Sequence, residues 1–226
     1  MSTAREQILS NLRKALGRGP LSPDREAALD ARLSDRRDTA IPARGRVEGR
    51  PRITAFCDEA ARVGTTVARV PSPAAVPGAI ATYLATHDLP TAIRLAPDPF
   101  LADLPWSEQA ALTTSAGPAR PTDAVSVTGA LAAVAETGTL VLASGPTSPT
   151  TLNFLPDTHI AVLRADTIVG AYEATWTVVR TAEGALPRVV NWITGPSRTA
   201  DIEQTLLIGV HGPHRQHIVL IDDQST

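Results

Sequence analysis

The stretch Ile193–Pro213 reads ITGPSRTADIEQTLLIGVHGP. It predicts an apolar strand that ends at Thr194, a tight turn at Gly195-Pro196, and a short helix over Thr199–Ile208 that ends at Gly209. Glycine lets the backbone approach a ligand closely, and the unpaired N–H groups at a helix N-terminus attract anions. The stretch therefore predicts both an α/β fold and a ligand site at the start of this helix.

Strands and helices alternate on both sides of this stretch. Further strands are predicted at Thr65–Val70, Thr91–Leu95, Ala124–Val127, His159–Arg164, Arg188–Thr194 and His217–Asp222. Helices are predicted at Arg52–Val63, Ala74–Thr86 and Ala171–Thr181. This alternation favours a mostly parallel sheet with flanking helices, in a single α/β domain over residues 51–226.

Residues 1–50 form a separate arm that is predicted to be helical and partly flexible. Ala4–Leu16 has apolar residues at helical spacing, Ser22–Arg36 is a second candidate helix, and Asp38–Arg50 is predicted to be poorly ordered. Residues 1–52 carry 12 basic and 7 acidic residues, a net charge of +5, and the remaining 9 and 16 give −7. This asymmetry indicates that the arm packs on its own body, on a partner or on a second copy, so a homo-oligomer stays open. Alternating charges and the lack of an aromatic residue before Phe56 argue against nucleic-acid binding.

Composition excludes several kinds of chemistry. Cys57 is the only cysteine, so the chain cannot supply the four thiolates of an iron–sulfur cluster. Lys14 is the only lysine and lies in the polar N-terminal arm, which argues against Schiff-base and pyridoxal phosphate chemistry. GxGxxG, GxSxG and P-loop motifs are absent, and no apolar run is long enough to span a membrane. We expect a cytoplasmic protein with no cofactor of its own.

The stretch Ala132–Ser144, AAVAETGTLVLAS, predicts two strands joined by a turn at Glu136-Thr137-Gly138-Thr139. A carboxylate at such a turn can act as a base or a nucleophile, with Thr137, Gly138 and Thr139 contacting a substrate. The alternative interpretation is an ordinary hairpin turn with a solvated glutamate. Both interpretations stay open at this point.

A second candidate group follows the turn at Gly195. Thr194, Gly195, Ser197 and Thr199 are more small and hydroxyl residues than helix capping requires, which favours contact with a ligand. Asp201 lies in the first turn of the predicted helix, where it would compete with an anion. We therefore expect something other than a simple phosphate cradle.

Histidines form the third candidate group. His211, His214 and His217 recur every three residues, but Gly212-Pro213 interrupts any helix between them, so no metal site is predicted. His211 lies between Gly209 and Gly212 and is predicted to line a pocket. His159 opens an apolar strand, where a structural role and a functional one are equally plausible.

Three segments resemble the lactate utilization protein C family, the LUD-domain proteins. They are AVAETGTLVLASGP at Ala133–Pro146, LPDTHIAVL at Leu155–Leu163, and the ITGPSRTADIE and LLIGVHGP parts of the opening stretch. The resemblance runs from about Thr65 to Asp222. It implies a fold like that of ribose-5-phosphate isomerase, glucosamine-6-phosphate deaminase and the CoA-transferases. It also implies oxidation of L-lactate to pyruvate together with cysteine-rich iron–sulfur subunits. Where the resemblance implies an arginine near Pro149–Leu152, this chain has Pro149-Thr150-Thr151.

Composition and resemblance together give the leading hypothesis. The chain is expected to be a non-redox subunit of an iron–sulfur assembly that oxidises L-lactate, with the clusters on partner subunits and a small anionic metabolite in a strand-end pocket. Tentative catalytic residues are Glu136 and His211. One alternative is a stand-alone enzyme like a phosphosugar isomerase or a CoA-transferase, with Glu136 as base or nucleophile. Another is a structural interaction module, so whether the chain is itself an enzyme stays open.

Overall fold

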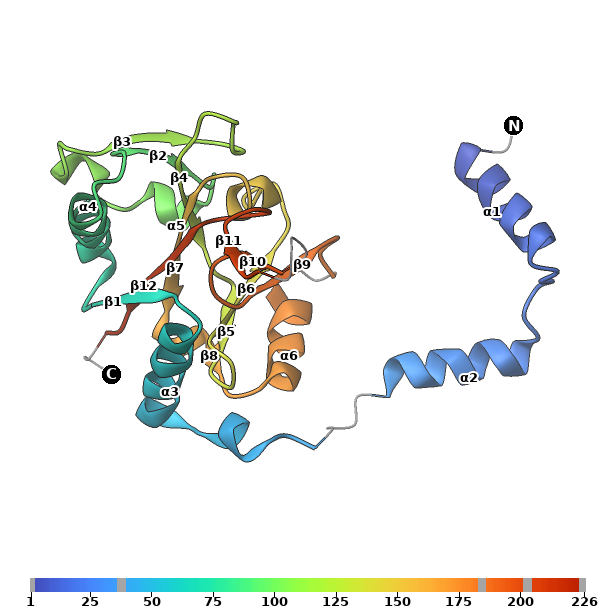
Figure 1. Ribbon diagram of the computed structural model, residues 1–226. Helices are drawn as coiled ribbons and strands as arrows, with labels where there is room; N and C mark the ends of the chain where they lie inside the picture. The colour runs from blue at the N-terminus through green and yellow to red at the C-terminus, as the bar shows by residue number, and fades with distance from the viewer. Residues whose placement is uncertain (1–2, 36–39, 183–185, 201–204, 224–226) are drawn as a thin grey trace. The chain divides into compact units, whose positions relative to one another are not determined.

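The computed structural model describes residues 3–35, 40–182, 186–200 and 205–223 (Figure 1). The chain divides into two compact units, Met1–Thr39 and Ala40–Thr226. The first unit contains two helices, α1 (Ala4–Ala15) and α2 (Pro23–Ser34). Helix α1 begins with a capping box, in which the Thr3 hydroxyl accepts from the backbone N–H of Glu6 and the Glu6 carboxylate accepts from that of Thr3.

The second unit is built on a parallel sheet of six strands (Figure 1). In spatial order these strands are β1 (Thr66–Val70), β12 (Arg215–Ile221), β7 (Thr158–Arg164), β4 (Val125–Gly129), β2 (Ala92–Leu95) and β3 (Thr113–Ala116). All strands point the same way, so their amino ends share one edge of the sheet and their carboxyl ends share the other. The central strands are buried along almost their whole length, and residues 160–163 of β7 and 218–221 of β12 are continuous apolar runs, as expected for a parallel sheet covered on both faces.

A second sheet contains four strands in the order β8 (Ile168–Val169), β5 (Ala132–Val134), β6 (Thr139–Ala143) and β9 (Val190–Ile193). This sheet and helix α3 (Gly49–Arg62) cover one face of the six-stranded sheet through a core that includes Phe56 and Leu163. Helices α4 (Val76–Thr86) and α5 (Pro99–Ala102) cover the other face. Helix α6 (Tyr172–Ala182) lies on the outer side of the second sheet. No helix in the described residues is long and apolar enough to cross a membrane.

The predicted fold class, a mostly parallel sheet with flanking helices, is confirmed. The two predicted strands around Glu136 are also confirmed, because β5 and β6 pair antiparallel with Val134 opposite Thr139. The sequence did not indicate α5 or β3, which are only four residues each. Short 3₁₀ turns complete the unit at Ala43–Arg46, Pro73–Ala75, Trp106–Glu108, Thr150–Asn153 and Ala165–Thr167.

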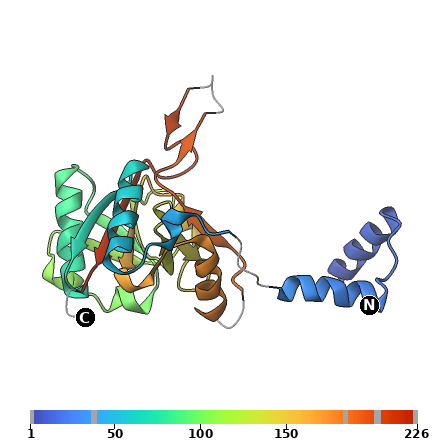
Figure 2. The same ribbon diagram turned by 90° about the horizontal axis from the view of Figure 1, so that it is seen from below.

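The predicted helix over Thr199–Ile208 is wrong. Within the described part of this segment, β10 (Arg198–Thr199) and β11 (Leu207–Ile208) pair antiparallel and project from the body of the unit (Figure 2). The backbone of Ser197 fixes this hairpin, since its N–H donates to the Pro213 carbonyl and its carbonyl accepts from the Gly209 N–H. These bonds tie both ends of the segment to each other, which a helix would prevent.

The prediction of poor order over Asp38–Arg50 is also wrong for the part that is described, from Ala40 onward. Residues 41–47, which we call the strap, form a 3₁₀ turn at Ala43–Arg46 and contact Glu136, Gly170 and Ala171, which follow strands β5 and β8 of the second sheet. Gly45 is buried there, and a Cβ on Gly170 would lie 2.2 Å from the Gly45 carbonyl oxygen. This close backbone contact requires glycine at position 170, and it helps to hold the polar strap in place.

Candidate functional site

Two of the predicted segments meet in a cluster of four hydroxyl groups, which we call the hydroxyl cluster. Thr139 Oγ1 lies 2.7 Å from Thr137 Oγ1 and 2.6 Å from Thr194 Oγ1. The fourth member is Tyr172, whose hydroxyl is 2.8 Å from Thr137 Oγ1 and 3.0 Å from Thr139 Oγ1. The ETGT turn and the end of β9 therefore meet in the structure, and the first residue of α6 joins them.

The hydrogen-bond count in this cluster limits what it can bind. Each of the four hydroxyls has one O–H donor, and the four contacts among them use one donor each. The cluster can therefore offer lone pairs to a ligand, but it can donate to an anion only by giving up an internal hydrogen bond. This arrangement suits a hydrogen-bond donor better than a carboxylate or a phosphate.

The glycines of both predicted segments contact protein and not an open pocket. A Cβ on Gly138 would lie 2.3 Å from the backbone nitrogen of Ala60, and a Cβ on Gly195 would lie 2.6 Å from the carbonyl oxygen of Val63. Both glycines have positive φ, of 65° and 82°. Their neighbours belong to the last turn and the C-cap of α3, so we call this region the α3 end. The glycines are needed here because α3 packs against the two loops.

Glu136 is buried beside the hydroxyl cluster and lies under the strap. Its side chain is 9% exposed, and its Oε1 accepts from Nε and Nη2 of Arg44 at 3.4 and 3.3 Å. Oε2 faces Gly45, since a Cβ there would lie 3.3 Å away. The carboxylate that the sequence offered as base or nucleophile is thus paired with an arginine and covered by the chain.

The remaining predicted residues of the opening stretch form a neighbouring loop pair. A Cβ on Gly212 would lie 3.2 Å from the Cβ of Ser197, and Gly209 bonds to the Ser197 carbonyl. Thr199 is buried in β10, whereas the side chain of His211 is exposed. Asp201 lies outside the described residues. Because no helix begins in the described part of this stretch, the helix N-terminus that was to attract an anion is absent there.

His159 is fully buried within the six-stranded sheet, where both of its ring nitrogens are used. Nδ1 is 3.1 Å from Gln216 Oε1, to which it donates, and Nε2 accepts from the Thr128 hydroxyl at 2.8 Å. Burial lowers the pKa of His159 to about 4, and the hydrogen bond to Gln216 offsets part of that effect. A neutral histidine with both nitrogens bonded holds three strands together and has no free nitrogen for a ligand.

His217 occupies a similar environment on the other face of this sheet. Its Nδ1 is 2.8 Å from the Thr66 hydroxyl, and its ring stacks on Tyr83 with centroids 3.8 Å apart. Burial, together with a smaller effect of the nearby His87, lowers the pKa of His217 to about 4. Among the described residues, no group of three or more His, Cys, Asp or Glu side chains is placed to hold a metal ion.

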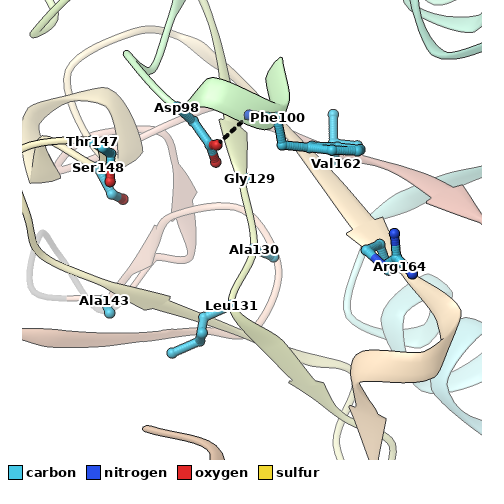
Figure 3. Close-up of a pocket in the computed structure, with 10 residues that line it drawn as sticks. All are labelled: Asp98, Phe100, Gly129, Ala130, Leu131, Ala143, Thr147, Ser148, Val162 and Arg164. Atoms are coloured by element: carbon cyan, nitrogen blue, oxygen red, sulfur yellow. Dashed lines mark hydrogen bonds between the residues drawn. The ribbon is translucent and has the colours of Figure 1, made fainter. Parts of the chain in front are cut away.

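The carboxyl edge of the six-stranded sheet, in contrast, contains a cavity of about 290 Å³ (Figure 3). It opens where the chain leaves β4 for β5, between the two sheets. Its apolar lining includes Phe100, Leu131 and Val162, and its polar lining consists of Asp98, Thr147, Ser148 and Arg164. Ligands of open parallel sheets bind at this edge, beyond the carboxyl ends of the strands.

Asp98 contributes the negative charge of this cavity. Its Oδ1 accepts from the Phe100 N–H at 2.9 Å and so caps α5, which leaves Oδ2 over the end of β4. A Cβ on Gly129 would lie 2.6 Å from that Oδ2 atom. The absence of a side chain at Gly129 therefore gives the carboxylate its place at the cavity wall.

Arg164, the last residue of β7, contributes the positive charge. Figure 3 shows it on the opposite side of the cavity from Thr147 and Ser148. Its Nε and Nη2 donate to Asp166 at 3.2 and 2.9 Å, and this ion pair lowers the pKa of Asp166. A second hollow of about 220 Å³ also borders Arg164. The pair with Asp166 leaves the Nη1 donors of the guanidinium for a bound anion.

Sequence reasoning missed Tyr172, Arg44, Asp98 and Arg164. For two of these residues, the sequence contains a pattern that could have identified them. Asp98 precedes Pro99, which is the pattern of a helix start, and Arg164 is the last residue of an apolar strand of a parallel sheet, where ligand contacts gather. Arg44 and Tyr172 had none, because their contacts join segments far apart in the sequence.

Comparison with known proteins covers mainly the C-terminal half of the chain. Residues 122–221 match the LUD domain family model. Lactate utilization protein C from Anoxybacillus flavithermus is 40% identical over 91 residues, and the protein of that name from a Geobacillus species is 42% identical over 94 residues. Lactate utilization protein C from Bacillus subtilis is 38% identical over 94 residues. The resemblance predicted from the three sequence segments is confirmed over this region.

These matches span about 40% of the length of the curated relatives and the same share of this chain. A crystal structure of a DUF162 family protein from Deinococcus radiodurans is similar over a longer range. It covers 78% of this chain and 99% of its own, with a TM-score of 0.56 and 25% identity. The fold thus extends beyond the segment in which sequence similarity is detected.

Proposed function

We propose that this chain, whose residues 122–221 match the LUD domain, serves lactate utilization as a subunit that binds a small carboxylate. Electron transfer is left to iron–sulfur partner subunits. The names of its relatives support the pathway. The single cysteine, Cys57, supports placing electron transfer on other subunits. Oxidation of lactate releases two electrons, and one thiolate cannot hold an iron–sulfur cluster to accept them.

The observation that carries the binding role is the cavity at the carboxyl edge, with Arg164 at one side. A guanidinium is the preferred partner of a carboxylate, and the apolar wall formed by Leu131 and Val162 suits a short carbon chain. We place the carboxylate near Arg164 because Asp98 repels it from the other side. We prefer this location to the α3 end as the carboxylate site. At the α3 end Glu136 is negatively charged, and the hydroxyl cluster can donate to an anion only by giving up an internal hydrogen bond.

Calorimetric titration with L-lactate and pyruvate tests the binding role. We expect binding in the millimolar range or tighter, and Arg164→Ala should weaken it about tenfold, since a charge-assisted hydrogen bond contributes about 1.5 kcal/mol. Arg62→Ala is the matched control, because Arg62 is also exposed and pairs with a nearby carboxylate, Glu59, but lies outside the cavity. Equal loss in both variants, or no binding by the wild type, would reject this site.

Co-purification tests the partner role separately. The chain is tagged and isolated from cells that express its natural neighbours, and the eluate is examined for bound iron and acid-labile sulfide. We expect cysteine-rich subunits to elute with the chain in fixed ratio. If the chain elutes without these subunits but binds lactate, the proposed assembly is contradicted and the proposed carboxylate site is not.

A further inference from the structure

Within the N-terminal unit, helices α1 and α2 do not cover their own apolar residues and leave a groove between them. Ile8, Leu9, Leu12 and Leu16 follow helical spacing along α1, yet α1 contains no buried residue, and Leu12 is 51% exposed. Leu21 in the connecting loop and Leu29 on α2 are exposed as well. A helix of 12 residues is marginal in water by itself, so such a pair gains stability when its apolar side is covered.

The groove is concave and basic at its rim. Between α1 and α2 it has a volume of about 700 Å³, with Leu9, Leu12, Leu16 and Leu21 along its floor. A connected hollow of about 540 Å³ extends it to Leu29. The charged side chains that line the two hollows are Arg13, Arg18, Arg25 and Glu26, three positive and one negative.

We infer that this groove docks an amphipathic helix of a partner protein, with an apolar stripe that fills the leucine floor and acidic residues that face the three arginines. Helix-in-groove recognition uses apolar residues at spacings of three and four, which matches the spacing of the floor. Opposite charges at the rim favour this partner and speed its association. The site is distinct from the carboxylate cavity, and neither depends on the other.

Charge and shape select this occupant over two others. A second hairpin packed groove to groove would bring two sets of Arg13, Arg18 and Arg25 into one interface, and like charges disfavour that contact. A membrane surface is broad, whereas a hollow between two helices takes a single convex ridge. A partner helix with glutamates beside its leucines satisfies both conditions.

Fluorescence anisotropy with designed peptides tests the inference on the full-length chain. One peptide is an amphipathic helix with a leucine stripe flanked by glutamates, and a second has the same stripe flanked by lysines. We expect the acidic peptide to bind at least about tenfold more tightly, and this preference to vanish at 1 M salt, where the Debye length is about 3 Å. Equal binding of both peptides, or no binding, would overturn the proposal.

Variants locate the binding site. Leu12→Asp places a charge on the groove floor and should weaken the acidic peptide at least about tenfold. Leu186→Asp is the matched control at an exposed leucine outside the N-terminal unit. Since Leu12→Asp can also perturb α1, the double variant Arg13→Glu, Arg18→Glu is measured as well and should reverse the preference toward the lysine peptide. Retention of the glutamate preference in the double variant contradicts the proposal.

The same variants separate the other occupants. Light scattering of the wild type at increasing concentration reports dimer formation, and flotation with vesicles rich in anionic lipid reports membrane binding. We expect that the groove does not mediate dimer formation. We also expect that the Leu12→Asp variant and the wild type bind vesicles to the same extent. A dimer, or flotation, that Leu12→Asp abolishes would assign the groove to a second copy or to a membrane and overturn the peptide partner.

Discussion

The α3 end and the carboxyl edge differ in how their polar groups find partners. At the α3 end, glycines give close contact between loops and helix, the hydroxyls bond to one another, and Glu136 is paired with Arg44. At the carboxyl edge, Asp98 and Arg164 line a hollow, and each retains capacity for a further hydrogen bond. The residues that look most special in the sequence serve packing, and ordinary residues form the cavity.

This difference has a general lesson for reading such sequences. Clusters of glycine, threonine and serine mark places where the backbone comes close to something, and that neighbour can be protein as readily as ligand. For Gly138 and Gly195 the neighbour is α3. Two of the four predictions below test whether the α3 end is structural, one tests the buried histidines of the six-stranded sheet, and one tests whether the carboxyl edge is available to ligand. They are ordered by the expected effect of a single substitution or a single titrating group.

Gly138→Ala should have the largest effect on stability. We expect it to lower the free energy of unfolding by about 3 kcal/mol or more, because a Cβ would both adopt a positive φ and overlap the backbone of α3. Urea denaturation measures the change. Gly117→Ala is the control, since φ is also positive there but no atom lies within 4 Å of the added Cβ. Equal losses in both variants would mean that the contact with α3 contributes nothing.

Acid should destabilise the protein through His159 and His217. The folded state holds both pKa values near 4, below the ordinary value of 6.5, so the unfolded chain binds protons first as the pH falls. Stability is therefore full above about pH 6.5 and decreases toward pH 4, by about 2 kcal/mol per histidine at pH 5. Urea denaturation between pH 7.5 and 4.5 measures this slope. In the His159→Gln variant, the number of protons taken up on unfolding, which sets the slope of stability against pH, should fall by about one. An unchanged slope would contradict the argument that burial lowers the pKa of His159.

Glu136→Gln should have a modest effect, although its side chain is buried. Its partner Arg44 is 65% exposed, and glutamine retains an acceptor for the guanidinium, so we expect a loss of about 1 kcal/mol or less. Thermal unfolding gives the change. The wild-type protein tests the CoA-transferase alternative, which requires an acyl adduct on Glu136 after incubation with acyl-CoA. Mass spectrometry of the wild type should show no adduct, and its presence would restore Glu136 as a nucleophile.

Gly129→Ala should have the smallest effect on stability and a specific effect on the cavity. The added Cβ would displace the flexible carboxylate of Asp98, so we expect less than about 1 kcal/mol of destabilisation. Lactate affinity should fall by about threefold, because the displaced negative charge enters the space offered to the anion. Calorimetry on this variant and on Arg164→Ala checks whether both charges act on one site. A Gly129→Ala protein with full affinity would place the ligand elsewhere.

The fold could be predicted to a large extent from local patterns. Apolar strands such as Thr158–Arg164 and their alternation with helices identified the parallel sheet, and Gly138 identified the hairpin of β5 and β6. The prediction failed for the segment after Gly195, because an apolar run near a glycine fits both a short helix and a hairpin. The backbone hydrogen bonds of Ser197 with Gly209 and Pro213 decide for the hairpin. Those bonds join residues 12 and more positions apart, which periodicity does not report.

The candidate site was less accessible to prediction. Thr139 and Thr194 were both candidate ligand-contacting residues, and the structure joins them to each other by a hydrogen bond of 2.6 Å. The cavity was not, since Asp98, Gly129, Thr147 and Arg164 come from four separate segments and each is an ordinary residue in its own context. The burial of Glu136 was equally hidden, because it depends on Arg44, 92 positions away.

The position of β12 has a consequence for how this protein is made. Strand β12 lies between β1 and β7, so Thr66 on the first strand of the sheet pairs with His217 on the last. On the ribosome, β1 therefore remains without its only neighbour in this sheet until the residues of β12 have emerged. Parallel pairing over such a distance is slow and exposes unpaired strand edges meanwhile. Until β12 is available, β1 and the side of β7 that faces β12 therefore have no partner strand in this sheet.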